Sequence, residues 1–192
     1  MSFASGRWIN EPQVWNASAD DLIVRTDVRT DFWRETHYGF THDDGHFWGH
    51  QTAGDFTAEV RVQARYGALY DQAGLMVRID AANWVKAGLE RSDGQVLLSS
   101  VLTVGRSDWA TGVYVGDPED FRIRAALQAG VLCLQVCSDG KTWPLVRLAP
   151  FPKAAAYRVG PMCCTPTRAG LEVRFSEFTV GPPVGKDIHD LS

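Results

Sequence analysis

The chain has 192 residues and a formal net charge of −4; 45% of its residues are hydrophobic and 22% are charged. This balance is ordinary for a globular protein with a full core, and the length suits a single domain. Lys and Arg are not concentrated in any stretch, so we expect no nucleic-acid partner. No apolar run approaches the roughly 18–20 residues that a membrane helix needs, so we expect no membrane partner either.

The first residues, MSFASGRWINEP, have neither the basic nor the apolar region of a secretory signal. Cys133 and Cys137 would lie about 13 Å apart in an extended strand, which is too far for a disulfide. Cys163 and Cys164 are adjacent, and vicinal disulfides are strained, whereas a bridge between the two pairs stays geometrically open. Without a signal we expect four reduced thiols and a cytoplasmic location.

Apolar and polar residues alternate along much of the chain, and this pattern predicts β-strands rather than helices. Two short strands are expected first, at Gln13–Asn16 and Leu22–Thr26, near an edge of the fold. The clearest alternation follows at Phe56–Arg65, where every second residue from Phe56 is apolar, and it recurs at Gln72–Ile79 and Trp84–Glu90. These strands are expected to bury one face and expose the other.

Turn-forming residues, with Asp93-Gly94 and Asp139-Gly140 as the sharpest hairpin signals, separate the later strands. About a dozen strands without an internal repeat predict a jelly roll of two large sheets rather than an immunoglobulin domain, a propeller or a solenoid. We expect one domain over residues 1–181 and a loosely ordered tail over 182–192. The later strands are predicted at Gln95–Val104, Trp109–Val115, Phe121–Leu127, Val131–Cys137, Trp143–Leu148, Ala156–Cys163 and Leu171–Val180.

Five segments carry a resemblance to a known family: Asp31–Arg34, Thr36–Phe40, Gly45–Phe47, Tyr70–Arg78 and Trp84–Glu90. Together they resemble domain of unknown function 1349, the family that includes the regulation-of-enolase protein. The resemblance spans nearly the whole chain. It implies an all-β, concanavalin A-like jelly-roll sandwich of two antiparallel sheets. The chain is also similar to the accessory β-sandwich behind the catalytic domain of some β-xylosidases. The resemblance implies no enzyme activity and no cofactor.

In curved sandwiches of this kind sugars lie on the concave face of one sheet, and the polar residues of two neighbouring strands are the first candidate site. A sugar site needs an aromatic plane and hydrogen-bonding groups around it. Trp84 would stack on the sugar, and the hydrogen bonds would come from Gln72, Arg78, Lys86 and Glu90. The alternative is that Lys86 and Glu90 form an exposed, salt-bridged row and that Trp84 caps the sheet edge.

The second candidate is a loop over Thr36–His50 that is rich in histidine and aspartate. Such residues can hold zinc, but here their spacing fixes no geometry, and we expect no metal ion. The loop is expected to line the mouth of the concave face, with Trp33, Tyr38 and His46 projecting towards it. Tyr38 and His46 would close the site. The candidate metal ligands in this loop are His37, His42, His46, His50, Asp43 and Asp44.

Catalytic motifs are absent from the sequence. Laminarinase-like enzymes of this fold carry Glu-x-Asp-x-x-Glu, but Arg61 stands where Glu59 would need an Asp, and Arg174 does so after Glu172. Glu59 and Glu90 could still face each other across neighbouring strands as a glycosidase pair. Nucleophile elbows, phosphate loops and dinucleotide fingerprints are also missing, so no catalytic residue is assigned.

We therefore expect a non-catalytic, lectin-like β-sandwich that binds a saccharide or a sugar-like metabolite on the concave sheet face. A protein-interaction or regulatory module of carbohydrate metabolism is the alternative, and a cryptic glycoside hydrolase is the second alternative. Fold resemblance alone does not decide among them, because one fold hosts many functions.

Overall fold

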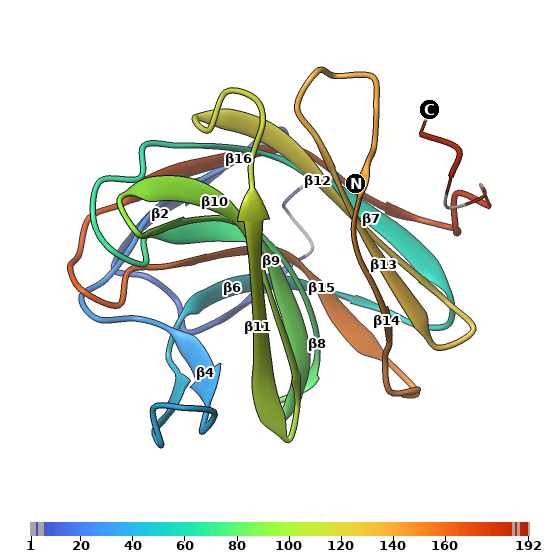
Figure 1. The fold of residues 1–192 in the computed structure, drawn as a ribbon, viewed down its shortest axis with the longest axis horizontal. Coiled ribbons are helices and arrows are strands. Elements are labelled where there is room, and N and C mark those ends of the chain that lie inside the picture. The colour runs from blue at the N-terminus through green and yellow to red at the C-terminus, as the bar shows by residue number, and fades with distance from the viewer. Residues whose placement is uncertain (1–2, 4–5, 186, 188, 192) are drawn as a thin grey trace.

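The computed structural model describes residues 3, 6–185, 187 and 189–191, and it consists of two seven-stranded antiparallel sheets packed face to face (Figure 1). Sheet A has the strand order β1 (Arg7–Ile9), β6 (His46–Thr52), β15 (Tyr157–Cys164), β8 (Gln72–Asp80), β9 (Asn83–Ser92), β10 (Gln95–Val104) and β11 (Arg106–Val113). Sheet B has the order β14 (Leu145–Pro150), β13 (Val131–Cys137), β12 (Asp120–Gln128), β7 (Phe56–Ala64), β16 (Glu172–Gly181), β3 (Asp21–Arg25) and β2 (Val14–Ala17). The predicted all-β sandwich is confirmed.

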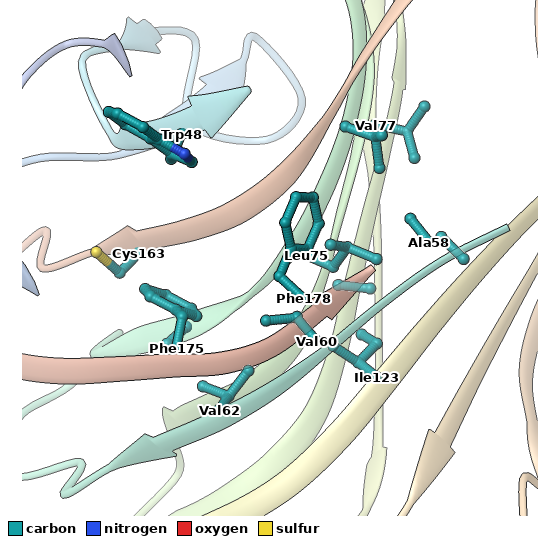
Figure 2. Close-up of a cluster of buried hydrophobic side chains, with 14 of the residues drawn as sticks. Trp48, Ala58, Val60, Val62, Leu75, Val77, Ile123, Cys163, Phe175 and Phe178 are labelled. Carbon is teal, nitrogen blue, oxygen red and sulfur yellow. The ribbon is translucent and has the colours of Figure 1, made fainter. Parts of the chain in front are cut away.

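The hydrophobic core fills the space between the two sheets, and period-2 alternation supplies it. Figure 2 shows Val60 of β7 and Ile123 of β12 from sheet B near Leu75 and Val77 of β8 from sheet A. The apolar residues predicted to share one face of β7, β8 and β9 are buried there, except Ile79, which is partly buried and packs against the core. Burying apolar side chains from both sheets is the main stabilising contribution to such a sandwich.

A third layer covers part of the outer face of sheet A, the face that points away from the core. It is a hairpin of β4 (Phe32–Arg34) and β5 (Thr41–Asp43), which Figure 1 shows beside β11. The hairpin buries a second apolar cluster against the sheet, so this face is not simply polar and solvated. The cluster consists of Phe32, Trp33, Phe47, Met76, Trp84, Val101, Met162 and Cys164.

Strand β6 explains why the segment Thr36–His50 was mispredicted as a loop. The segment contains β5 and most of β6. Phe47 packs under the hairpin while Trp48 packs in the main core, so this strand is covered on both faces. A strand buried on both faces shows no alternation of apolar and polar residues, and the pattern that revealed the other strands is missing here.

Two glycines meet in the middle of sheet A. Gly74 of β8 pairs directly with Gly88 of β9. A Cβ atom on Gly74 would lie 1.9 Å from the Ala87 carbonyl oxygen, and one on Gly88 would lie 2.1 Å from that of Ala73. These distances are far below contact distance, so the close approach of the two strands requires glycine at both positions.

The adjacent cysteines point to opposite faces of β15, as alternation in a strand requires. Cys163 belongs to the main core, and Cys164 belongs to the cluster under the hairpin. All four cysteines are free thiols. Within the described residues, no helix has the length and apolar character needed to cross a bilayer.

The predicted boundary between the domain and a loose tail lies after Gly181. Two described residues of the tail contact sheet B or the loop beside it: Val184 N donates to Thr57 Oγ1 at 3.0 Å, and Leu191 O accepts from Trp143 N at 2.9 Å. These contacts place the described part of the segment against the sandwich. Its loose attachment remains a prediction, and Lys186, Ile188 and Ser192 lie outside the described residues.

Candidate functional site

A pocket of about 250 Å³ lies between the outer face of sheet A and the β4–β5 hairpin. Its floor comes from β8, β9, β10 and β11, whereas its walls come from the hairpin and from the loops around Tyr70 and Pro166. The pocket is lined by Asp31, Trp33, Tyr38, Phe40, Tyr70, Gln72, Lys86, Glu90, Val101, Trp109, Pro166 and Thr167.

Four aromatic residues form a closed circuit around this pocket, which we call the aromatic cage: Trp33, Tyr38, Tyr70 and Trp109. The ring centroids of Trp33 lie 5.6 Å from Tyr38 and 6.5 Å from Trp109, and those of Trp109 and Tyr70 are 6.3 Å apart. The circuit closes through the hydroxyl groups of Tyr38 and Tyr70, which are 3.4 Å apart. Phe40 extends it by stacking on Tyr38 at 5.3 Å.

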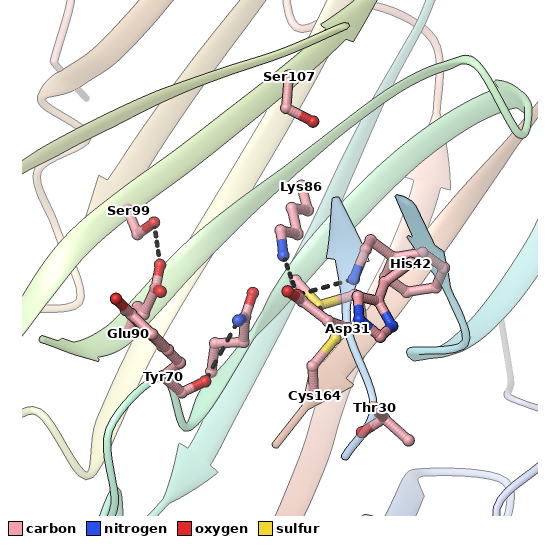
Figure 3. A network of polar contacts seen from close by, with 12 residues as sticks. Thr30, Asp31, His42, Tyr70, Lys86, Glu90, Ser99, Ser107 and Cys164 are labelled. Atoms are coloured by element: carbon pink, nitrogen blue, oxygen red, sulfur yellow. Dashed lines mark hydrogen bonds and ion pairs between the residues drawn. The ribbon is translucent and has the colours of Figure 1, made fainter. Parts of the chain in front are cut away.

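The floor carries a buried ion pair between Lys86 of β9 and Asp31, the residue before the hairpin (Figure 3). Lys86 Nζ donates to Asp31 Oδ1 at 2.9 Å, and the lysine is only 4% exposed. Burial is the largest effect and would lower the pKa of Lys86, but Asp31, Cys164 and Glu90 together outweigh burial and the pKa is raised. Lys86 is therefore a charged ammonium that already has its counter-ion.

Glu90 lies further along the same strand face and is also buried, with 5% of its surface exposed. Ser99 donates to Glu90 Oε2 at 2.5 Å, and Trp109 Nε1 donates in turn to the Ser99 hydroxyl at 3.0 Å. Burial raises the pKa of Glu90, and Lys86 and Ser99 oppose that effect only in part. Trp109 also helps to stabilise the carboxylate, which lines the pocket and can accept from a ligand there.

Three residues around the pocket have left-handed backbone conformations that L residues rarely adopt. The φ angles are 61° at Glu35, 64° at His37 and 63° at Tyr70. Such conformations cost free energy and fix the course of the loops that carry the walls.

The hairpin is fixed to the sheet by a second ion pair outside the pocket. Arg78 of β8 donates to both Asp43 oxygens, at 2.6 and 2.8 Å, and its guanidinium lies 5.8 Å from the centre of the Phe32 ring. Two parallel hydrogen bonds hold the hairpin in one orientation. The structure therefore places Arg78 in an anchor for the pocket wall and away from the pocket surface.

Four of the predicted site residues meet in the pocket: Tyr38, Gln72, Lys86 and Glu90. The exposed, salt-bridged row proposed as an alternative for Lys86 and Glu90 is wrong, because both are buried and Lys86 pairs with Asp31 instead.

Besides Arg78, two further predicted site residues lie outside the pocket. Trp84 is 0% exposed and packs 6.0 Å from Phe32 beneath the hairpin, so its ring offers no face to the pocket. It does not cap a sheet edge either, since β9 is an inner strand. His46 is buried beside the loop that follows β3, where Nδ1 contacts Asn10 O at 2.7 Å and Nε2 accepts from Asp27 N at 3.0 Å.

Several other residues that line the pocket were not predicted from the sequence. Phe40, Tyr70 and Trp109 lie on or beside loops and an edge strand, and Asp31 precedes the hairpin. Aromatic residues flanked by turn-forming residues were the available signal, but residues so distant in sequence meet only through the sheet order.

The histidines do not gather into a metal centre. Within the described part of the chain, no group of three or more His, Cys, Asp or Glu side chains is arranged to hold a metal ion. His42 instead lies 3.1 Å from Asp44, and His37 packs on Tyr38.

The arrangement left open for Glu59 and Glu90, a glycosidase pair across neighbouring strands, is not found. Glu59 belongs to β7 in sheet B, where it accepts from Arg124 Nε at 2.6 Å, and Glu90 belongs to β9 in sheet A. The two strands lie in different layers and are not neighbours.

Comparisons with solved structures show this architecture in other proteins. A functionally unknown protein from Saccharomyces cerevisiae superposes with a TM-score of 0.94 at 56% identity, covering 96% of this chain and 100% of that chain. The GH43 BlXynB protein from Bacillus licheniformis gives a TM-score of 0.63 at 13% identity, covering 90% of this chain but 36% of that one. The latter likeness shows the fold alone.

Sequence comparison gives the family. "Regulation of enolase protein 1" of Saccharomyces cerevisiae is 58% identical over 189 residues, which is 98% of this chain and 96% of the yeast protein. The family model described as "Protein of unknown function (DUF1349)" matches residues 8–183. The match covers nearly the whole sandwich, so the chain belongs to the DUF1349 family.

Proposed function

We propose that the protein is a non-catalytic binding module whose pocket holds one sugar ring or a sugar-like metabolite. The observation that carries the proposal is the aromatic cage closed around a buried polar floor. Aromatic faces stack on the apolar faces of a sugar, while Gln72, Lys86 and Glu90 offer both donors and acceptors to its hydroxyl groups.

The dimensions of the pocket favour a small ligand. Pockets for drug-sized molecules span about 300–1,000 Å³, and this pocket of about 250 Å³ lies below that range. The Tyr38–Tyr70 contact joins two of its walls. We infer that the ligand is a free sugar or a chain end rather than the interior of a polysaccharide.

We propose no catalysis because only one of the two carboxyl groups in the pocket is free of an ion pair with another side chain of the pocket. Asp31 and Glu90 both line it, but Asp31 is the counter-ion of Lys86 and its Oδ1 also accepts from the Phe32 amide at 2.8 Å. Hydrolysis by two carboxyl groups needs both of them at the glycosidic bond.

Isothermal titration calorimetry with a panel of pentoses and hexoses tests the proposal. Saturable one-site binding is expected, and Phe40→Ala is expected to weaken it about two- to tenfold because one wall ring is lost. Phe40 is 43% exposed, so this substitution has little effect on the core. Val115→Ala, an exposed apolar residue outside the pocket, is the matched control. The absence of binding by every sugar would overturn the proposal.

A second candidate function is that of a protein-interaction module, and the name of the yeast relative favours it. In this chain, exposed Tyr38, Phe40 and Leu69 lie at or beside the pocket mouth and could take part in such a contact. A pull-down with the full chain, repeated with Phe40→Ala, separates the two proposals. One stoichiometric partner without any sugar affinity would favour the interaction module. For either function we propose a cytoplasmic location, which the four free thiols support.

A further inference from the structure

The pocket is lined by more acidic than basic side chains. Its charged lining residues are two acids, Asp31 and Glu90, and one base, Lys86. Lys86 and Asp31 pair with each other at 2.9 Å, and among the described residues Glu90 forms no ion pair of its own, although the charge of Lys86 favours its ionised form. A buried carboxylate that lacks a counter-ion is costly, so an incoming cation would gain by supplying one.

The walls of the pocket favour the same sign of charge. The faces of Trp and Tyr rings carry negative electrostatic potential and attract ammonium groups. The aromatic cage supplies four such rings around the floor, and Trp109 is linked to Glu90 through the Ser99 hydroxyl. Aromatic cages with a nearby carboxylate are well suited to bind organic cations.

An anionic ligand would meet the opposite situation. Lys86 is the one cation that lines the pocket within the described residues, and Asp31 already neutralises it. A phosphate or carboxylate group placed there would face Glu90 and the ring faces without compensation. Phosphorylated or acidic sugars are therefore disfavoured.

We infer that the pocket selects a sugar-like ligand that bears an ammonium group, with the ammonium directed at the Glu90 carboxylate. This inference rests on the proposed function for the sugar-like part of the ligand. The choice between amine and hydroxyl rests separately on the charge of the floor and on the aromatic cage.

Calorimetry with matched sugars tests the inference at pH 6.5, where an amino sugar is largely protonated. Glucosamine, galactosamine and mannosamine are titrated into the full chain beside glucose, galactose and mannose, and the N-acetyl forms serve as uncharged amides. We expect at least one amino sugar to bind about tenfold or more tightly than both of its uncharged counterparts. Glucose 6-phosphate is expected not to bind.

Glu90→Gln separates charge from shape. Gln can still accept from Ser99, so the site keeps its shape, and the affinity of the variant for the amino sugar is expected to fall to its affinity for the neutral sugar. Glu119→Gln, which removes an exposed acid that pairs with Arg65, is the matched control and should keep the preference. A preference for the amine that persists in Glu90→Gln would overturn the role given to Glu90.

Failure of the inference and failure of the proposed function give different results. Equal affinity for amino and neutral sugars overturns the inference and leaves the sugar site in place. Lack of binding by every sugar overturns the sugar site. Choline and its uncharged isostere 3,3-dimethylbutan-1-ol then test the charge preference alone: selective binding of choline supports it, and equal or absent binding of both overturns it.

Discussion

Lys86 and Asp31 are 55 positions apart in the chain, yet Nζ and Oδ1 lie 2.9 Å from each other beneath the pocket. The lysine rises from the middle of sheet A, and the aspartate opens the hairpin that covers it. This ion pair is part of the pocket floor and also a fastening between two layers of the fold. Substitutions at this ion pair can therefore show how much it contributes to the stability of the fold.

Asp31→Asn is expected to lower the free energy of unfolding by about 3 kcal/mol, because it leaves a buried ammonium without its counter-ion. Lys86→Met in the same chain is expected to restore part of that loss, since the double variant removes both members of the pair. Urea denaturation of wild type, both single variants and the double variant gives the coupling between the two sites. Purely additive losses would contradict the importance of the pair.

Trp84→Ala is expected to cost about 3–5 kcal/mol of stability, because a large, fully buried side chain is removed from the cluster under the hairpin. The remaining folded protein should keep its ligand affinity within about twofold, since the Trp84 ring does not line the pocket. Thermal melts and calorimetry below the melting temperature check both parts. A large loss of affinity with little loss of stability would show that Trp84 contacts ligand.

The buried Glu90 gives stability a defined pH dependence. Burial raises its pKa above the ordinary value of 4.5, so the folded state holds the proton more tightly than the unfolded state. The contribution of Glu90 to stability is therefore lost as the pH rises above about 4.5 through the folded pKa. Glu90→Gln lacks this loss, and its stability relative to wild type should increase between pH 4 and pH 7.5. A pH-independent difference in urea denaturation would refute this.

Thiol accessibility is expected to separate the four cysteines. Cys133 is partly exposed, whereas Cys137, Cys163 and Cys164 are buried, and burial raises the pKa of Cys163 and Cys164 far above its ordinary value. Titration with a disulfide reagent should find one reactive thiol in the native protein and four in urea. Cys133→Ser should remove the native reaction, and a rapid reaction in that variant would contradict the assignment.

Asp43→Asn is expected to loosen the hairpin without unfolding the sandwich. The substitution weakens the two hydrogen bonds with Arg78, while Lys86 and Asp31 still hold the start of the hairpin. Hydrogen exchange should become faster over residues 32–43 and stay unchanged in β7 and β12, which lie in the opposite sheet. Unaltered exchange in the hairpin would show that the anchor is not needed.

The sandwich was predictable from sequence because most strands have one buried and one polar face. The alternation of β7, β8 and β9 gave both the strands and their inward residues, and the turns around Gly94 and Gly140 gave the hairpins. Strand β6 was not predicted because both of its faces are covered, so apolar and polar residues do not alternate along it. The hairpin β4–β5 escaped because its strands are only three residues long.

The floor of the candidate site was predictable and its walls were largely not. Gln72 of β8 pairs directly with Glu90 of β9, and Lys86 lies on the same face of β9, so their proximity follows from the pairing of two neighbouring strands. Trp33 meets Trp109 only because the hairpin folds onto sheet A beside β11. The role of Trp84 could not be judged from alternation, since the same face continues from the open pocket to the covered part of the sheet.

The glycine pair Gly74–Gly88 fixes the sheet beneath the pocket, whereas the aromatic rings at the pocket rim can vary. With no side chain possible at either position, the spacing between the strands that carry Gln72 and Glu90 is set by the main chain. Two of the four cage residues, Tyr38 and Tyr70, in contrast, stand on connecting segments that tolerate exchange. A new ligand preference can therefore evolve, or be engineered, by replacing rings at the rim while the sheet beneath them remains untouched.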